Sequence, residues 1–405
     1  MRILMIHNHY QQYGGEDAVT KSVFDLLVRN RDDVYLYERS NLEINDLPLR
    51  QKIETLLNMP WSRQSYREVK LILREFFKPD VVHVFNTFFT VTPAIYYACK
   101  EEGIPVVQSL FNYRLICANA LFLRDNRHCS DCLTKSRWRS VLYPCYRNSR
   151  ILTALVVKMI NQHWKLGTWL NYVDQYITVT EFSRQQFIKA GIPASRIMTQ
   201  PHFLPTNPQP RTQSQHYALY IGRLSTEKGV ELMMQAWKDI KTIPLKIMGT
   251  GPLHEKLRLA VKNNNLTNIE VLGYQPEDEY ERYLKGAKFL VVPSINYDNF
   301  PRTIVEAYSY GVPVVTSSLD GIKEFVKPGV SGELFQVGNP KDLADKVNWL
   351  ALQDERLEKM SIGSRQEFEK LYTADVYYPF LMSAYRKAIE TSQKKAVLKE
   401  DFALR

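Results

Sequence analysis

The sequence lacks the two features that mark secreted and membrane-spanning chains. Met1 and Arg2 lead directly into the apolar residues 3–6, so the apolar region of a secretory signal is missing. No apolar run reaches the ~18 residues that a membrane-spanning helix needs. Cysteine is scarce, at five of 405 residues, and we expect reduced thiols and a cytoplasmic location.

Acidic residues are too few to balance the basic ones. The chain has 53 Lys and Arg against 43 Asp and Glu, a formal net charge of +10 at pH 7. This surplus favours anionic partners, such as nucleotide ligands or the lipids at the inner face of the plasma membrane. The basic residues are spread along the chain without a recognition motif, so we expect no nucleic-acid partner. The fingerprint G-x-G-x-x-G is also missing, which argues against a nicotinamide cofactor.

Strand-like and helix-like stretches alternate along both halves of the chain. Continuous apolar runs such as residues 3–6 and 218–221 are typical of strands that are buried on both faces of a sheet. Amphipathic helical stretches lie between these runs. The alternation predicts an α/β protein with parallel sheets and right-handed crossovers.

Composition marks a domain boundary. Residues 201–215 hold four prolines among Asn, Gln, Thr and Ser, which is typical of a linker. The tail beyond residue 376 is amphipathic and long enough to reach back to the first half. We predict a first domain at residues 1–205 with a cysteine-rich insertion at 112–150, a second domain at 206–375, and a C-terminal helix at 376–405 that returns to the first domain.

Residues 289–317 are predicted to form a strand, a loop, a helix and a further strand. Pro301 suits the first position of the helix, and Gly311 suits the left-handed position that ends it. A loop between a parallel strand and a helix N-terminus is where open α/β sheets bind ligands, and its N–H groups favour a phosphate. Asp298 precedes this helix and Glu306 lies on its second turn.

A second candidate ligand loop follows the strand-like run 218–221. Arg223 offers a planar guanidinium and Lys228 a point charge, a pair that fits a diphosphate. The alternative interpretation is two solvated surface cations. A glycine turn expected at the same sheet edge consists of Gly249, Thr250, Gly251 and Pro252.

Near the N-terminus, Gly14 and Gly15 follow the first predicted strand and its loop. Without a Cβ, both residues would let the backbone approach a ligand. The alternative interpretation is a tight turn without a ligand.

Four of the five cysteines gather in the insertion. They are Cys117, Cys129, Cys132 and Cys145. In a reducing compartment this spacing suits a tetrahedral structural zinc site better than disulfides. The alternative is a redox-inert or transiently oxidised set in a surface insertion.

Two other features have a structural and a functional interpretation. His83, on an apolar strand, is by default a core histidine with satisfied hydrogen bonds, and otherwise a ligand contact. Residues 151–173 are predicted to be one helix of the core, and otherwise a basic aromatic face that lies on a membrane.

Together these pieces resemble the family-four retaining glycosyltransferases. The resemblance covers nearly the whole chain and rests on the glycine loops and on the unit from Asp298 to Pro313. It implies two Rossmann-like doubly wound parallel-sheet domains that face each other across a cleft, the type-B glycosyltransferase fold. The start Tyr13-Gly14-Gly15-Glu16-Asp17 and the cysteine-rich insertion are similar to a bacterial subgroup that acts in exopolysaccharide, capsule or O-antigen assembly.

The resemblance also implies an activity: transfer of a hexose from a UDP-, GDP- or ADP-linked donor to a glycan or lipid-linked acceptor. Arg223 and Lys228 would hold the donor diphosphate, Glu306 the ribose, and Asp298 the donor sugar. The other donor-binding residues that it implies are Gly14, Gly15, Gly222, Gly251, Asn299, Phe300, Pro301 and Thr303. It implies no catalytic metal or other cofactor.

Two positions depart from the family pattern. Asp298 stands where the family usually has Glu, so its reach is one methylene shorter and the donor sugar is open. Phe111 stands where the family often has His, and a phenyl ring cannot hydrogen-bond a sugar hydroxyl. These two departures motivate one alternative to a transferase, a nucleotide-sugar-binding subunit with weakened turnover. A second alternative is another enzyme class on the same architecture, a sugar-nucleotide 2-epimerase.

Overall fold

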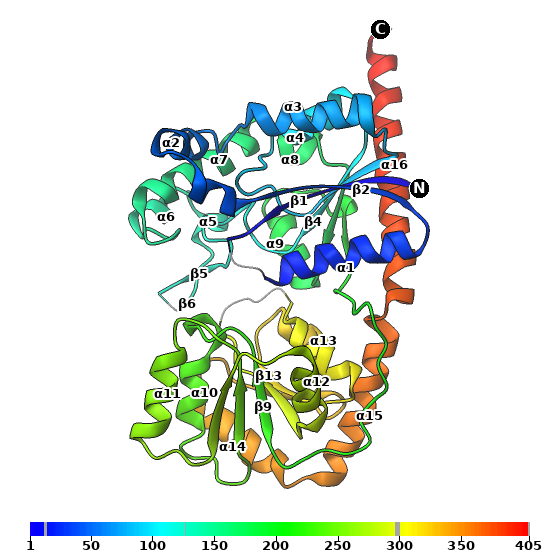
Figure 1. Ribbon diagram of the computed structural model, residues 1–405. Helices are drawn as coiled ribbons and strands as arrows, with labels where there is room; N and C mark the ends of the chain where they lie inside the picture. The colour runs from blue at the N-terminus through cyan, green and yellow to red at the C-terminus, as the bar shows by residue number, and fades with distance from the viewer. Residues whose placement is uncertain (12–13, 126, 296–299, 404–405) are drawn as a thin grey trace. The chain divides into compact units, whose positions relative to one another are not determined.

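The computed structural model describes residues 1–405 except 12–13, 126, 296–299 and 404–405, with side chains up to Lys395. Contacts divide the chain into two compact units (Figure 1). Unit 1 consists of Met1–Phe122, Cys129–His202 and Tyr377–Arg405, and unit 2 consists of Leu123–His128 and Phe203–Val376. None of the described helices is both long and apolar enough to cross a membrane.

A six-stranded sheet forms the centre of unit 1, in the order β2-β1-β3-β4-β7-β8 (Figure 1). The strands are β1 (Arg2–His9), β2 (Asp33–Ser40), β3 (Val81–Val84), β4 (Val106–Leu110), β7 (Gln175–Thr178) and β8 (Ile197–Thr199). All of its strand pairs are parallel. The order reverses between β1 and β3, and open sheets bind ligands at the carboxyl ends of the strands beside such a reversal.

Helices connect these strands or, in the case of α16, return to unit 1 from unit 2. They are α1 (Gly15–Arg29), α2 (Leu49–Leu57), α3 (Arg63–Leu71), α4 (Ile95–Glu101), α5 (Asp131–Thr134), α6 (Arg139–Leu142), α7 (Arg150–Lys165), α8 (Thr168–Asn171), α9 (Glu181–Lys189) and α16 (Ala374–Ala403). Helix α1 begins with Glu16 and Asp17 and ends with Arg29, an order that suits the helix dipole. It buries Val19, Val23, Leu26 and Leu27, which are spaced to share one face.

His83 lies in the core of unit 1 and has two hydrogen-bond partners. Its Nδ1 is 2.8 Å from the hydroxyl of Tyr385 on α16, and its Nε2 is 2.8 Å from the hydroxyl of Ser109 on β4. Burial lowers the pKa of His83 to about 3, so the ring is neutral at pH 7. The prediction of a satisfied core histidine is confirmed, and His83 links α16 to the sheet.

The prediction of a single helix over residues 151–173 is wrong, because Gly167 interrupts it. Gly167 has φ +66° and separates α7 from α8, and this left-handed conformation cannot continue a helix. His163 and Trp169 are buried in the core. These two rings therefore belong to the core, as the first interpretation held, and not to a membrane face.

Unit 2 is built on a second six-stranded parallel sheet, in the order β11-β10-β9-β12-β13-β14 (Figure 1). Its strands are β9 (Ala218–Ile221), β10 (Leu245–Met248), β11 (Ile269–Gly273), β12 (Phe289–Val292), β13 (Val314–Ser317) and β14 (Gly332–Phe335). In chain order this is 3-2-1-4-5-6, the order of a Rossmann sheet. The predicted doubly wound α/β fold is confirmed.

The helices of unit 2 pack on this sheet. They are α10 (Val230–Ala236), α11 (His254–Asn263), α12 (Glu277–Gly286), α13 (Arg302–Ser309), α14 (Pro340–Ala351) and α15 (Asp354–Leu371). Trp237, Phe289 and Leu343 are fully buried in one apolar cluster of this unit. The hairpin of β5 (Leu123–Arg124) and β6 (Arg127–His128) is grouped with unit 2 by its contacts.

Candidate functional site

The strand order of unit 2 reverses between β9 and β12, which are neighbours in the sheet. The loop after β9 carries Arg223 and Lys228, and the loop after β12 leads to α13 and Glu306. Ligands of Rossmann sheets bind at the carboxyl ends of the strands beside such a reversal. The topology therefore brings the two predicted loops to one place.

The two loops are tied to each other through their backbones. The N–H of Ile295 donates to the carbonyl of Glu227 at 3.0 Å. Gly229 has φ +71°, and a Cβ added to it would lie 1.8 Å from the carbonyl oxygen of Pro293. Glycine is therefore required at this crossing for both its conformation and its size. Arg223 is exposed, and Lys228 is partly buried on the short helix η4 (Thr226–Lys228).

The second glycine turn packs directly on the first loop. Leu224 N–H donates to the Thr250 carbonyl at 2.9 Å, and a Cβ on Gly251 would lie 2.5 Å from the Leu224 carbonyl oxygen. A Cβ on Gly249 would lie 2.0 Å from the carbonyl oxygen of Gly222. Close backbone packing thus accounts for these glycines, and donor binding by Gly222 and Gly251 stays a prediction.

Helix α13 begins one residue later than predicted, because Pro301 is its N-cap and Arg302 its first residue. Phe300 is buried, with its ring 4.7 Å from that of Phe325, and Thr303 lies on the first turn. Gly311 has φ +70°, which confirms its predicted left-handed conformation. Asp298 and Asn299 lie outside the described residues.

Glu306 has two partners within unit 2. It accepts a hydrogen bond from the hydroxyl of Tyr280 on α12, and its carboxylate is 3.5 Å from the guanidinium of Arg302. Burial and this carboxylate raise the pKa of Tyr280 well above its usual value. Tyr280 could not be placed beside Glu306 from the sequence, because the two residues lie 26 positions apart in the chain.

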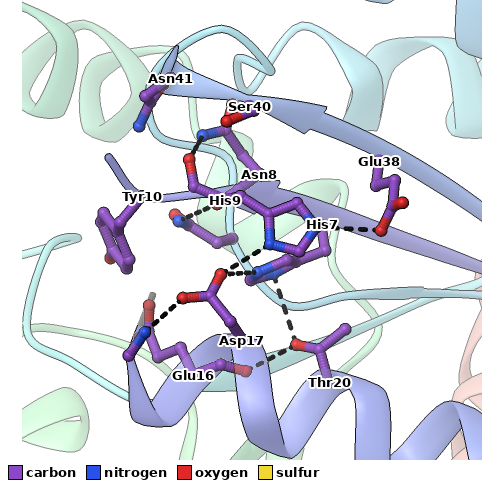
Figure 2. A network of polar contacts seen from close by, with 12 residues as sticks. His7, Asn8, His9, Tyr10, Glu16, Asp17, Thr20, Glu38, Ser40 and Asn41 are labelled. Carbon is purple, nitrogen blue, oxygen red and sulfur yellow. Dashed lines mark hydrogen bonds and ion pairs between the residues drawn. The ribbon is translucent and has the colours of Figure 1, made fainter. Parts of the chain in front are cut away.

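In unit 1, a polar network joins the end of β1 to the start of α1 (Figure 2). Gly14 is extended and forms the N-cap of α1. Its N–H donates to Asp17 Oδ2 at 2.8 Å. His7 Nε2 and His9 Nδ1 meet the other carboxylate oxygen, Oδ1, at 2.9 and 2.8 Å. His9 Nε2 in turn lies 2.9 Å from Glu38 Oε2 on β2.

The environment of this network shifts two of its pKa values in opposite directions. Burial opposes charge on His9, but its bonds to Glu38 and Asp17 outweigh this and raise its pKa. Burial likewise opposes charge on Asp17, but bonds from His7, Gly14 and His9 outweigh it and lower its pKa. The carboxylate of Asp17 is therefore ionised at neutral pH.

Glu16 lies beside this network on the first turn of α1. Its Oε1 accepts from the amide of Asn112 at 2.6 Å, and its Oε2 is buried without a partner among the described residues. Burial raises its pKa. A Cβ added to Gly15 would meet none of the described residues within 4 Å. The donor contacts of Gly14 and Gly15 stay predictions.

Phe111 packs among other rings. Its ring centroid is 4.6 Å from that of His202 and 5.9 Å from that of Phe85. The polar contact to the start of α1 comes from the next residue, Asn112, through its bond to Glu16.

The predicted zinc cysteines lie in two environments. Cys117 and Cys132 are buried, whereas Cys129 and Cys145 are partly exposed. The Cys132 thiol lowers the pKa of Cys117, while Cys117 and burial raise that of Cys132, so these two thiols are close partners. Among the described residues, no three of these cysteines bring their sulfur atoms within 4.8 Å of one another. The zinc assignment stays a prediction.

Two family profiles match successive parts of the chain, which together cover residues 23–367. Residues 23–207 match the profile described as Glycosyltransferase Family 4, and residues 206–367 match Glycosyl transferases group 1. The chain belongs to this glycosyltransferase family. The predicted family resemblance is thus confirmed.

Curated relatives of this family-four chain match it over part of their length. The uncharacterized glycosyltransferase MJ1178 of Methanocaldococcus jannaschii is 34% identical over 158 residues, 39% of this chain and 44% of that protein. The amylovoran biosynthesis glycosyltransferase AmsK of Erwinia amylovora is 26% identical over 170 residues, 40% and 42% of the two chains. The chain thus spans less than half the length of these relatives.

Solved structures share the fold of both units. Anabaena Alr3699/HepE in complex with UDP-glucose has a TM-score of 0.64 at 16% identity, covering 97% of this chain and 100% of that one. The lipopolysaccharide outer core galactosyltransferase WaaB, in its apo form, has a TM-score of 0.62 at 16% identity, covering 96% and 99%. At this identity the likeness concerns the fold alone.

Proposed function

We propose that the protein transfers a hexose from a nucleotide-sugar donor to a hydroxyl of a glycan or lipid-linked acceptor, with the anomeric configuration retained, in polysaccharide assembly. The observation that carries the proposal is the pair of neighbouring strand ends, β9 and β12, which bring Arg223, Lys228 and the N-terminus of α13 to one edge of the unit 2 sheet. The UDP-glucose complex of HepE and the amylovoran biosynthesis named for AmsK support the donor and pathway classes.

The chemistry follows from charge. The leaving nucleoside diphosphate gains negative charge as its bond to the anomeric carbon breaks. Arg223 and Lys228 stabilise that charge more in the transition state than in the ground state, which accelerates the step. The acceptor hydroxyl attacks from the side of the leaving group, and the leaving phosphate takes its proton. A trapped covalent glycosyl-enzyme would contradict this front-side mechanism.

The test begins with donor binding. We expect one class among UDP-, GDP- and ADP-sugars to raise the melting temperature of unit 2 by about 5–10 °C at about 100 times its Kd. Labelled donor of that class is then incubated with membrane extract. Labelled glycolipid supports the proposal. Bound nucleotide without labelled product would instead identify a binding subunit, and a new sugar nucleotide formed without acceptor would identify an epimerase.

A basic surface of unit 1 supports peripheral contact with an anionic membrane. Residues 132–173 contain no Asp or Glu and seven Lys or Arg. Trp138, Leu142 and Ile151, on or beside α6 and the start of α7, are 50, 66 and 76% exposed. Apolar side chains beside clustered cations are the composition of an interfacial membrane-binding surface. The proposed membrane surface therefore lies before α7 and on its first turn, and not along residues 151–173, where it was the alternative to a core helix.

Vesicle binding tests this surface. We expect the protein to sediment with vesicles that contain phosphatidylglycerol and not with pure phosphatidylcholine. The double variant Leu142→Gln/Ile151→Gln should weaken partitioning about tenfold, because it removes two inserted aliphatic side chains. Leu352→Gln/Ile362→Gln, at 68 and 57% exposed positions of unit 2, is the matched control. Equal vesicle binding by the two double variants would show that α6 and the start of α7 do not form the membrane-binding surface.

A further inference from the structure

Three potential metal ligands converge where β1 ends and α1 begins (Figure 2). His7 Nε2, His9 Nδ1 and a carboxylate oxygen of Asp17 all lie within 4.8 Å of one another. The side chains of His7 and Asp17 are 0 and 1% exposed, and that of His9 is 31% exposed. The group is therefore held in the interior with one side open to solvent.

The two nitrogen–oxygen distances indicate a coordination geometry. Two ligand atoms about 2.1 Å from one ion lie about 3.0 Å apart at a right angle and about 3.4 Å apart at the tetrahedral angle. His7 Nε2 and His9 Nδ1 lie 2.9 and 2.8 Å from Asp17 Oδ1. These separations suit a six-coordinate ion in which each imidazole nitrogen lies at a right angle to the carboxylate oxygen.

Without an ion, the contacts at this position fix the protons on both rings. A carboxylate only accepts hydrogen bonds, so both ring nitrogens that face Asp17 would have to carry protons. His9 Nε2 faces a second carboxylate, Glu38, at 2.9 Å, so His9 would have to carry two protons. A metal ion bound at His9 Nδ1 leaves that ring neutral, with its single proton directed at Glu38.

The surrounding residues have the arrangement of an outer shell. Histidines that bind metals usually donate their other ring N–H to a carboxylate or another acceptor. His9 has Glu38 in that position, and His7 Nδ1 lies 3.4 Å from the hydroxyl of Thr20. Asp17 is itself oriented by the Gly14 N–H at 2.8 Å. Each of the three ligands thus has a second residue that fixes its direction.

We propose that His7, His9 and Asp17 bind a divalent first-row transition-metal ion. Two nitrogen ligands and one oxygen ligand suit Mn²⁺, Fe²⁺, Co²⁺, Ni²⁺ or Zn²⁺ rather than Ca²⁺ or Mg²⁺, which prefer oxygen. Because Asp17 also holds Gly14, the ion fixes the N-terminus of α1 against β1 and, through Glu38, against β2. The role is structural and does not depend on the proposed transferase activity.

The test uses tag-free protein that has been treated with a chelator and dialysed. Titration with Co²⁺, and separately with Mn²⁺ and Zn²⁺, is followed by calorimetry and visible absorption. We expect about one equivalent of Co²⁺ to bind, and the melting temperature to rise with Co²⁺ concentration. His9→Gln should weaken binding at least tenfold, and Glu38→Gln about 10–100-fold, because an outer-shell partner is lost.

His254→Gln is the matched control, since the side chain of His254 is 29% exposed and also lies beside a glutamate, Glu255. It should bind Co²⁺ like the unaltered protein. If cysteines bind Co²⁺, the complex should show sulfur-to-cobalt charge-transfer absorption. The double variant Cys117→Ser/Cys132→Ser should lose this absorption but still bind the one equivalent of Co²⁺ that depends on His9. Unchanged binding in both His9→Gln and Glu38→Gln, or Kd values above about 1 mM for all three ions, would overturn the site.

Discussion

Replacing Arg223 with alanine should lower the rate of sugar transfer by about 10²–10³-fold, the effect of removing one preorganised group that stabilises transition-state charge. The variant should stay folded, because Arg223 is exposed and the fixed contact at this residue is made by its backbone. The carbonyl of Arg223 accepts from the hydroxyl of Tyr220 at 2.9 Å, and alanine retains that carbonyl. The measurement is kcat and KM with the donor identified by thermal shift.

The division of the activity loss in Arg223→Ala between kcat and KM tests whether Arg223 acts on the leaving diphosphate. A group that acts on the leaving diphosphate lowers kcat, whereas a group that only binds the donor raises KM. Arg223→Lys should recover part of the activity, since lysine restores the charge but not the planar fork. Lys262→Ala removes one exposed cation from the last turn of α11 and should have no effect. Near-normal turnover in Arg223→Ala would mean that the diphosphate is held elsewhere.

The regular elements of this fold could be predicted because their signals are local. The apolar run at residues 289–292 is itself the strand β12, and the left-handed Gly311 directly follows the C-cap of the helix α13 that it ends. The break between α7 and α8 was missed, although Gly167 was visible, because apolar periodicity continues on both sides of it. An isolated glycine inside a helical pattern is often tolerated.

The partners of the candidate site residues could be predicted only in part, because they are distant in sequence. Glu306 could be placed on α13, but its bond to Tyr280 joins residues 26 positions apart. His9 and Glu38 are 29 apart and meet only because β1 and β2 pair in register. A single sequence shows the chemistry of each side chain but not the strand order that brings two of them together.

The glycine at position 229 should be among the least replaceable residues of unit 2. Gly229→Ala should destabilise this unit by about 3 kcal/mol or more, because alanine in a left-handed conformation costs about 1–2 kcal/mol and the clash adds to it. The clash is with the Pro293 carbonyl oxygen, 1.8 Å from the added Cβ. To relieve it, the loops after β9 and β12 must separate, which would also break the bond between Ile295 and Glu227.

Gly338→Ala isolates the contribution of the clash. Gly338 has φ +73°, nearly the φ of Gly229, but an added Cβ would meet none of the described residues within 4 Å. Its alanine variant should therefore lose only the conformational term, about 1–2 kcal/mol. Hydrogen exchange of peptides that cover β9 and β12 measures the stability of unit 2 directly, and Gly229→Ala should also weaken donor binding. Equal hydrogen-exchange rates in the two variants would mean that the loops after β9 and β12 do not approach each other as closely as the Gly229–Pro293 contact requires. The sheet edge proposed to hold the diphosphate would then not be rigid.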